Sequence, residues 1–190
     1  REELALGAAA TLLKTSPERL WRRLLITAYE DIGVADFETV AFITSAIKGK
    51  TWRAKVGGEW AVASYFVMRM CHMTKCRATD DLAYVCELHP DFEQSRIDLP
   101  FKPITELLKV VSGKGAVPER ALALWFAIGT DRCRSNVLRM RKGEPWAVFD
   151  ALCEQGFPEG VVEVCREGFR KSGEIMTAFL VLLWSEAHRS

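Results

Sequence analysis

The sequence lacks any apolar run long enough to cross a membrane. The longest run, Ile175 to Trp184, spans about ten residues, whereas a transmembrane helix needs about 20. We therefore expect a buried helix there. No secretory leader pattern opens the sequence. An excess of one charge is also missing, because 26 Lys and Arg stand against 25 Asp and Glu, a formal net charge of +1. This balance disfavours binding of nucleic acid over the whole surface and leaves a local basic patch open.

The motifs of self-contained catalytic centres are missing as well. The sequence contains no G-x-S-x-G, no H-E-x-x-H and no complete G-x-x-x-x-G-K-[ST] phosphate loop. The letters GKT at 49–51 match only the end of a phosphate loop, because the first glycine of that motif is absent. We expect no ATP site, no cofactor and no catalytic residues, so a binding or assembly function is favoured over an enzyme.

Cysteine occurs at six scattered positions, 71, 76, 86, 133, 153 and 165. These spacings do not form a disulfide framework, and we expect reduced thiols in a cytoplasmic protein. The only cluster with metal-ligand residue types consists of Cys71, His72, Cys76, Cys86 and His89. Because Cys71 and Cys76 lie five positions apart on one expected helix, their side chains diverge. We expect small core residues there rather than a zinc site.

Helical periodicity is present in nearly every segment. Residues 2–14 are rich in Ala and Leu, and Ser16-Pro17-Glu18 is a strong helix start with Ser16 as the cap. The helix that follows carries an apolar stripe, expected in the core, of Trp21, Leu24, Leu25, Ala28 and Ile32. Gly33 supplies the stop, and Asp36 starts a helix to about residue 48. No segment alternates convincingly as a strand, so we predict an all-α fold.

The rest of the chain divides into two regions. Further helices are expected over Glu59 to Lys75, 79–89, 104–112, 118–129, 131–140, 144–155, 158–171 and 174–187. Residues 49–58 are expected to form a basic loop, and the proline-rich segment 90–103 is the best candidate linker. We therefore predict a first helical region over 1–90, a linker over 91–103 and a second helical lobe over 104–190.

Basic residues gather in two places. The first cluster contains Lys48, Lys50, Arg53 and Lys55. The second contains Arg132, Arg134, Arg139, Arg141 and Lys142, with Trp146 close behind. A solvated surface is one interpretation of both. The second cluster is the denser one, and it also supports a surface that contacts nucleic-acid phosphates.

The stretch 22–36, RRLLITAYEDIGVAD, poses an electrostatic question. Glu30 and Asp31 precede Gly33, at the negative pole of the expected helix, where each exposed acid costs about 0.3–1 kcal/mol. Arg22 and Arg23 lie about two turns away, too far for a direct pair within the helix. The compensating groups must come from another helix, another chain, or the N-terminus of the helix begun by Asp36. A buried ion network within one chain, which would fix the packing of the first three helices, and an intersubunit role are both open.

The same stretch resembles the C-terminal region of clamp-loader-like AAA+ ATPases of the RarA/MgsA family, relatives of the Werner-helicase-interacting protein. The matching letters are Arg22, Arg23, Ala28, Glu30, Asp31, Ile32, Gly33, Ala35 and Asp36. The similarity covers about residues 1–90, with weaker matches at Gly58-Glu59, Ala61, Ala63 and Lys75. Cys76-Arg77 replaces the family's Ser-Asn, and its aromatic, glycine-containing motif is not evident after residue 100.

The resemblance implies a collar-like helical bundle that oligomerises, without its own ATP site, in a protein of DNA replication or repair whose ATPase domain lies N-terminally. The alternative is a stand-alone helical protein that binds an unknown protein or ligand. The expected helix at 59–75 supports assembly, because large apolar side chains, among them Trp60 and Phe66, cover most of its circumference. We predict a homo-oligomer, a dimer or a tetramer, with replication proteins or DNA as possible partners.

Overall fold

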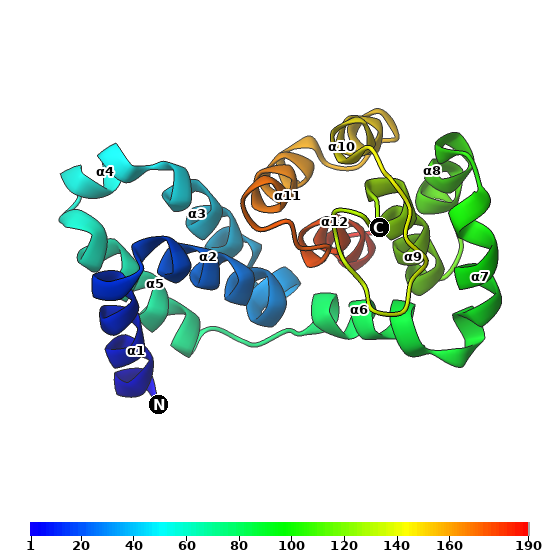
Figure 1. The fold of residues 1–190 in the computed structure, drawn as a ribbon. Helices are drawn as coiled ribbons and strands as arrows, with labels where there is room; N and C mark the ends of the chain where they lie inside the picture. Colours follow the sequence, from blue (N-terminus) through cyan, green and yellow to red (C-terminus); the bar gives the residue numbers. More distant parts are fainter. Residues whose placement is uncertain (190) are drawn as a thin grey trace. The chain divides into compact units, whose positions relative to one another are not determined.

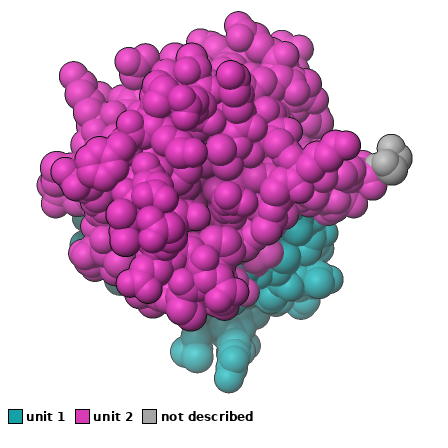
Figure 2. Space-filling view, turned by 90° about the vertical axis from the view of Figure 1, so that its right-hand side faces the viewer, with its two compact units in different colours: residues 1–77 teal, residues 78–190 magenta. Residues whose placement is uncertain are grey.

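A computed structural model of the chain describes residues 1–189, and in that range it contains helices and no strand. The predicted all-α fold is confirmed. The helices form two compact units, which we call unit 1 (residues 1–77) and unit 2 (from Ala78 onward), shown in Figure 2. No helix in the described range combines the length and the apolar character needed to cross a bilayer.

Unit 1 consists of five α-helices and two short irregular helical turns (Figure 1). They are α1 (Glu2–Thr15), α2 (Pro17–Thr27), the π-helical turn η1 (Ala28–Ile32), the 3₁₀ turn η2 (Gly33–Asp36), α3 (Phe37–Lys48), α4 (Lys50–Lys55) and α5 (Gly58–His72). Helix α1 packs on α5 and α2, and α2 also packs on α3. Helices α1, α2, α3 and α5 each contribute buried apolar residues to one shared core.

The predicted core stripe of unit 1 is confirmed. Leu25, Ala28 and Ile32 are fully buried, and Trp21 and Leu24 are nearly so. Gly33 stops the π-helical turn with a positive φ of 49°, a region that favours glycine. Asp36 caps α3 as predicted, because its Oδ1 accepts a hydrogen bond from the Thr39 backbone N–H at 3.1 Å. The predicted Ser16 cap is wrong, since its side chain makes no capping hydrogen bond to α2.

Unit 2 contains the remaining helices. They are α6 (Ala78–Leu88), η3 (Pro90–Phe92), α7 (Glu93–Asp98), η4 (Leu99–Phe101), α8 (Ile104–Ser112), α9 (Val117–Ile128), α10 (Pro145–Glu154), α11 (Glu159–Ser172) and α12 (Met176–Ala187). Helix α9 lies among α6, α8, α10 and α12 (Figure 1). Its residues from Arg120 to Ile128 are all buried. A helix that is apolar on every side can only be the centre of a core, and α9 has that place in unit 2.

Three segments differ from the sequence prediction. Residues 50–55 form helix α4 instead of continuing a loop. Residues 90–101 fold into the short helices η3, α7 and η4 within unit 2, and the boundary between the units lies at Arg77 and Ala78. The helix predicted at 131–140 is absent, and α9 connects to α10 through the irregular segment 129–144.

Candidate functional site

The acidic pair Glu30–Asp31 lies in the π-helical turn η1, and a cation from the same chain meets it. Arg77, which follows α5, donates from Nη1 to Asp31 Oδ1 at 3.1 Å. The neighbouring Cys76 backbone N–H donates to the Asp31 carbonyl at 2.8 Å. Glu30 is half-buried in the same turn. Arg77 of the same chain therefore pairs with Asp31. This pair lies near the surface, with side chains 53% and 32% exposed, so it is not the buried network that one of the two alternatives expected.

Asp36 is the centre of a second polar cluster. Beyond capping α3, its Oδ2 lies 3.4 Å from Arg69 Nη2 of α5. The same Arg69 nitrogen lies 3.3 Å from Glu38 Oε2, and its Nη1 donates to the Tyr65 hydroxyl at 3.2 Å. Burial alone raises the pKa of Asp36, but hydrogen bonds from Thr39 and the charge of Arg69 outweigh it and hold that pKa below its usual value. The carboxylate thus ties the start of α3 to α5.

Arg53 of the first basic cluster is a structural residue. Its side chain is only 6% exposed, and its guanidinium lies over the Trp21 ring at 4.3 Å from the centroid. Its Nε donates to Glu59 Oε1 at 2.9 Å, and Nη1 donates to the carbonyls of Ala46 and Ile47. These bonds fix α4 against α2, α3 and the start of α5. Lys48, Lys50 and Lys55 are exposed.

Exposed apolar side chains gather on unit 1 between α3, α4 and α5. Phe42, Trp52, Val56 and Tyr65 are each 48–49% exposed and line a hollow of about 410 Å³. We call this hollow the aromatic groove. Trp60 and Met68 of α5 are 42% and 38% exposed. By helical geometry they lie on the same solvent-exposed face of α5 as Tyr65, which is at one edge of that face. An apolar cluster of this kind, with several aromatic rings, is typical of interaction surfaces.

Phe66 is not the exposed contact residue that the sequence suggested. It is only 3% exposed, because it lies on the face of α5 that turns toward the core of unit 1. With Val62 it forms the floor of the aromatic groove. Trp60, by contrast, is exposed at the surface, so the two aromatic residues predicted for the interface divide into one surface side chain and one core side chain.

In unit 2, the second basic cluster lies on the segment 129–144, which we call the basic loop. Thr130 Oγ1 donates to the Arg139 carbonyl at 2.8 Å and accepts from the Arg141 backbone N–H at 2.7 Å. Gly143 N–H donates to Asp131 Oδ1 at 3.2 Å, and the Gly143 backbone lies so close to Ile128 that no Cβ would fit. These contacts close the two ends of the loop, which explains why residues 131–140 are not helical.

The five predicted phosphate-contact residues differ in their exposure to solvent. Arg132, Arg134, Arg139 and Lys142 are exposed. The Arg139 guanidinium stacks on the Phe101 ring at 4.4 Å from the centroid, and Phe101 is 66% exposed. Arg141 is half-buried, and its guanidinium donates to the carbonyls of Pro100 and Lys102, so it anchors the loop. The basic loop therefore presents four cations to solvent, one of them on an aromatic ring.

The remaining two candidates, Arg22 and Arg23, are exposed on α2. Arg23 lines a cavity between α1, α2 and α5 that sequence reasoning did not identify. The only hint in the sequence was the run of alanines at 8–10.

The Cys and His residues do not assemble into a site. Within residues 1–189 no group of three or more Cys, His, Asp or Glu is placed to hold a metal ion. Burial raises the pKa of the Cys86 thiol and of the Cys133 thiol to about 12. Burial also raises the pKa of the Cys165 thiol well above its usual value. Cys71 is exposed.

Comparison of the chain with protein-family models, with curated proteins and with solved structures finds no match.

Proposed function

We propose that this chain is an assembly module that forms a homo-oligomer through the aromatic groove of unit 1. One observation carries the proposal. Four large apolar side chains, each about half exposed, surround a single hollow of about 410 Å³ on a unit that already has its own buried core. Removing such side chains from water is the main source of affinity between proteins, at about 25 cal/mol per Å² of apolar surface buried.

A second copy of the chain is the occupant that the groove favours. Helix α5 carries both an edge of the groove, Tyr65, and a neighbouring exposed ridge of Trp60 and Met68. Two copies related by a twofold axis near α5 would place the ridge of each beside the groove of the other, which is the self-complementarity of an isologous interface. The charged groups beside the groove, Arg69 and Glu59, have ion-pair partners inside unit 1. Because both charges are paired within unit 1, a partner at the groove needs no opposite charge.

A link to DNA is supported by two further observations. Residues 1–90 resemble the C-terminal region of replication-associated AAA+ ATPases. The basic loop of unit 2 presents exposed cations beside Phe101, a combination suited to phosphates and unstacked bases. In this proposal the chain is the oligomerising, accessory part of a protein of DNA replication or repair. The rival function, a stand-alone helical protein with a different partner, keeps the groove but gives the basic loop no role.

Matched tryptophan variants test the assembly step. Trp52 is 49% exposed in the aromatic groove, and Trp146 is 48% exposed on α10 of unit 2. We expect Trp52→Glu and Trp60→Glu to lower the sedimentation coefficient to that of a monomer, because each puts a charge into the interface. Trp146→Glu should leave the oligomer intact. Dissociation by Trp146→Glu alone would refute the groove as the interface.

Charge-removing variants test the link to DNA. The triple change Arg132→Ala, Arg134→Ala and Lys142→Ala should weaken binding of a labelled single-stranded oligonucleotide and reduce its salt dependence. The control removes three exposed lysines of unit 2 outside the loop, Lys109, Lys114 and Lys171. Equal losses in both triple variants, or no binding by the unchanged protein, would contradict the DNA-contact role.

A further inference from the structure

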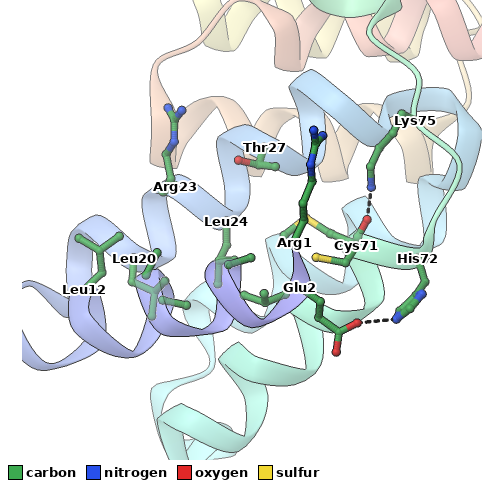
Figure 3. A pocket seen from close by; sticks show the side chains of 15 residues that line it. Arg1, Glu2, Leu12, Leu20, Arg23, Leu24, Thr27, Cys71, His72 and Lys75 are labelled. Atoms are coloured by element: carbon green, nitrogen blue, oxygen red, sulfur yellow. Dashed lines mark hydrogen bonds and ion pairs between the residues drawn. The ribbon is translucent and has the colours of Figure 1, made fainter.

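A second cavity of unit 1 lies between α1, α2 and α5 and is separate in its lining from the aromatic groove (Figure 3). Its volume is about 500 Å³, within the range of about 300–1,000 Å³ that holds small organic ligands. The walls are apolar and include Leu12 of α1, Leu20 and Leu24 of α2, and Val67 and Met70 of α5. Such a cavity suits an alkyl chain.

The composition of α1 explains why the space is open. The helix faces the cavity with Ala5, Ala8 and Ala9, whose side chains end at Cβ. Larger side chains at these positions would fill the volume between α1 and the leucines of α2. Because only Ala9 of α1 is buried, the helix covers the cavity without closing it.

Cations stand at the opening of this apolar cavity. Arg1, Arg23 and Lys75 line it together with His72 and Glu2. In Figure 3 the charged ends of Arg23, Arg1 and Lys75 lie above the side chains of the labelled leucines. The single carboxylate, Glu2, is already bonded to His72, with its Oε2 2.7 Å from Nε2. The rim therefore carries three cationic side chains, Arg1, Arg23 and Lys75, against one carboxylate.

Two of these cations, Lys75 and Arg23, differ in whether they already have a hydrogen-bond partner. Lys75 Nζ donates to the Met70 carbonyl at the end of α5, which fixes its ammonium beside the cavity. The Arg23 guanidinium makes no hydrogen bond and no ion pair with any of residues 1–189, and no dashed line reaches it in Figure 3. An anion at the rim would pair with Arg23 without breaking an existing contact.

We propose that this cavity binds single-chain amphiphiles with an anionic head, of which alkyl carboxylates are the simplest. The alkyl chain lies among Leu20, Leu24 and Met70, and the carboxylate is held by Arg23 and Lys75. The inference is independent of the assembly function, because no residue of the aromatic groove takes part.

Two series of ligands test the apolar cavity and the cationic rim separately, one by chain length and one by head group. Calorimetric titration with octanoate, decanoate and dodecanoate should show an affinity that rises about two- to fourfold for each added methylene. Dodecanol should bind more weakly than dodecanoate, and dodecyltrimethylammonium more weakly still, because the rim is cationic. Equal affinities for the three head groups, or no dependence on chain length, would overturn the proposal.

Adjacent residues provide matched variants. Arg22 and Arg23 are both exposed on α2, but only Arg23 lines the cavity. Arg23→Gln should weaken dodecanoate binding about three- to tenfold and leave dodecanol binding unchanged, whereas Arg22→Gln should change neither. Ala8→Phe should fill the cavity and abolish binding, whereas Thr11→Phe, at an exposed position of α1 outside the lining, should not. Equal effects within either pair would overturn the assignment.

Protection of a thiol gives a readout that needs no variant. Cys71 lines the cavity and is exposed, whereas Cys153 lies in unit 2. Dodecanoate below its micelle concentration should slow alkylation of Cys71 relative to Cys153 in the same molecules. Vesicles with anionic headgroups form the second arm, because a bilayer offers the same chemistry as a free acid. Protection by the free acid alone assigns a soluble ligand, protection by vesicles alone assigns a membrane lipid, and protection by neither overturns the proposal.

Discussion

Arg77 and Asp31 form an ion pair across 46 positions of sequence, with Nη1 3.1 Å from Oδ1. The Arg77 side chain is 53% exposed and that of Asp31 is 32% exposed, so water screens the pair. We expect Arg77→Met to lower the free energy of unfolding by no more than about 1 kcal/mol. Arg77→Glu should cost more, because it sets two carboxylates side by side. Urea titrations of both variants check this, and a loss of several kcal/mol in Arg77→Met would contradict it.

Asp36 should make stability depend on pH in the acid range. Its pKa is lowered in the folded chain, so its stabilising contribution is complete above the unfolded pKa of about 3.9 and is lost as pH falls through the folded value. We expect Asp36→Asn to cost about 1 kcal/mol at neutral pH and progressively less as the pH falls below the unfolded pKa. The control is Glu38→Gln, since Glu38 is 69% exposed and contacts the same Arg69. Equal losses of unfolding free energy from both changes at neutral pH would contradict the stabilising role given to Asp36.

Arg53 should be the one residue of its basic cluster that stability requires. Removing its guanidinium takes the cation away from Glu59, which keeps the hydrogen bond from Trp21 Nε1, and removes a donor from the carbonyls of Ala46 and Ile47. We expect Arg53→Met to lower the free energy of unfolding by about 2–3 kcal/mol, because hydrogen bonds to a charged group are lost and Glu59 is one-third exposed to water. Lys55→Met, at an exposed position of the same helix, should change it by no more than about 0.5 kcal/mol. Chemical denaturation followed by circular dichroism measures both, and similar values for the two variants would be the contrary result.

The six thiols should react at very different rates. Burial raises the pKa of Cys86 and of Cys133 to about 12, so they hold almost no thiolate near neutral pH. Cys71 is exposed and should be alkylated first in the native protein. Mass spectrometry of peptides after a short iodoacetamide pulse gives the order. Early modification of Cys86 or Cys133 in folded protein would show that those thiols are not enclosed as described.

Local signals in the sequence were sufficient to predict the core stripe of α2 and η1 and the cap of α3 in unit 1. The stripe around Leu25 follows from helical periodicity, and the Asp36 cap follows from residue type and spacing. Neither depends on a residue far away in the chain.

Tertiary contacts decided the features that sequence reasoning missed. Helix α4 is held by the stacking of Arg53 on Trp21, which lies 32 positions earlier in the sequence. The basic loop is irregular because Thr130 and Asp131 bond to backbone groups near Arg141 and Gly143, which no helical pattern reveals. The apolar cavity exists because alanines of α1 meet leucines of α2, and the sequence does not show which face of α1 packs where.

Sedimentation equilibrium of the unchanged protein at micromolar concentration decides whether the chain assembles, because assembly through the aromatic groove requires a mass above that of one chain. We expect a discrete dimer or tetramer of the 21.4 kDa chain that dissociates in Trp60→Glu. A single monomeric species of 21.4 kDa over the whole concentration range would contradict it.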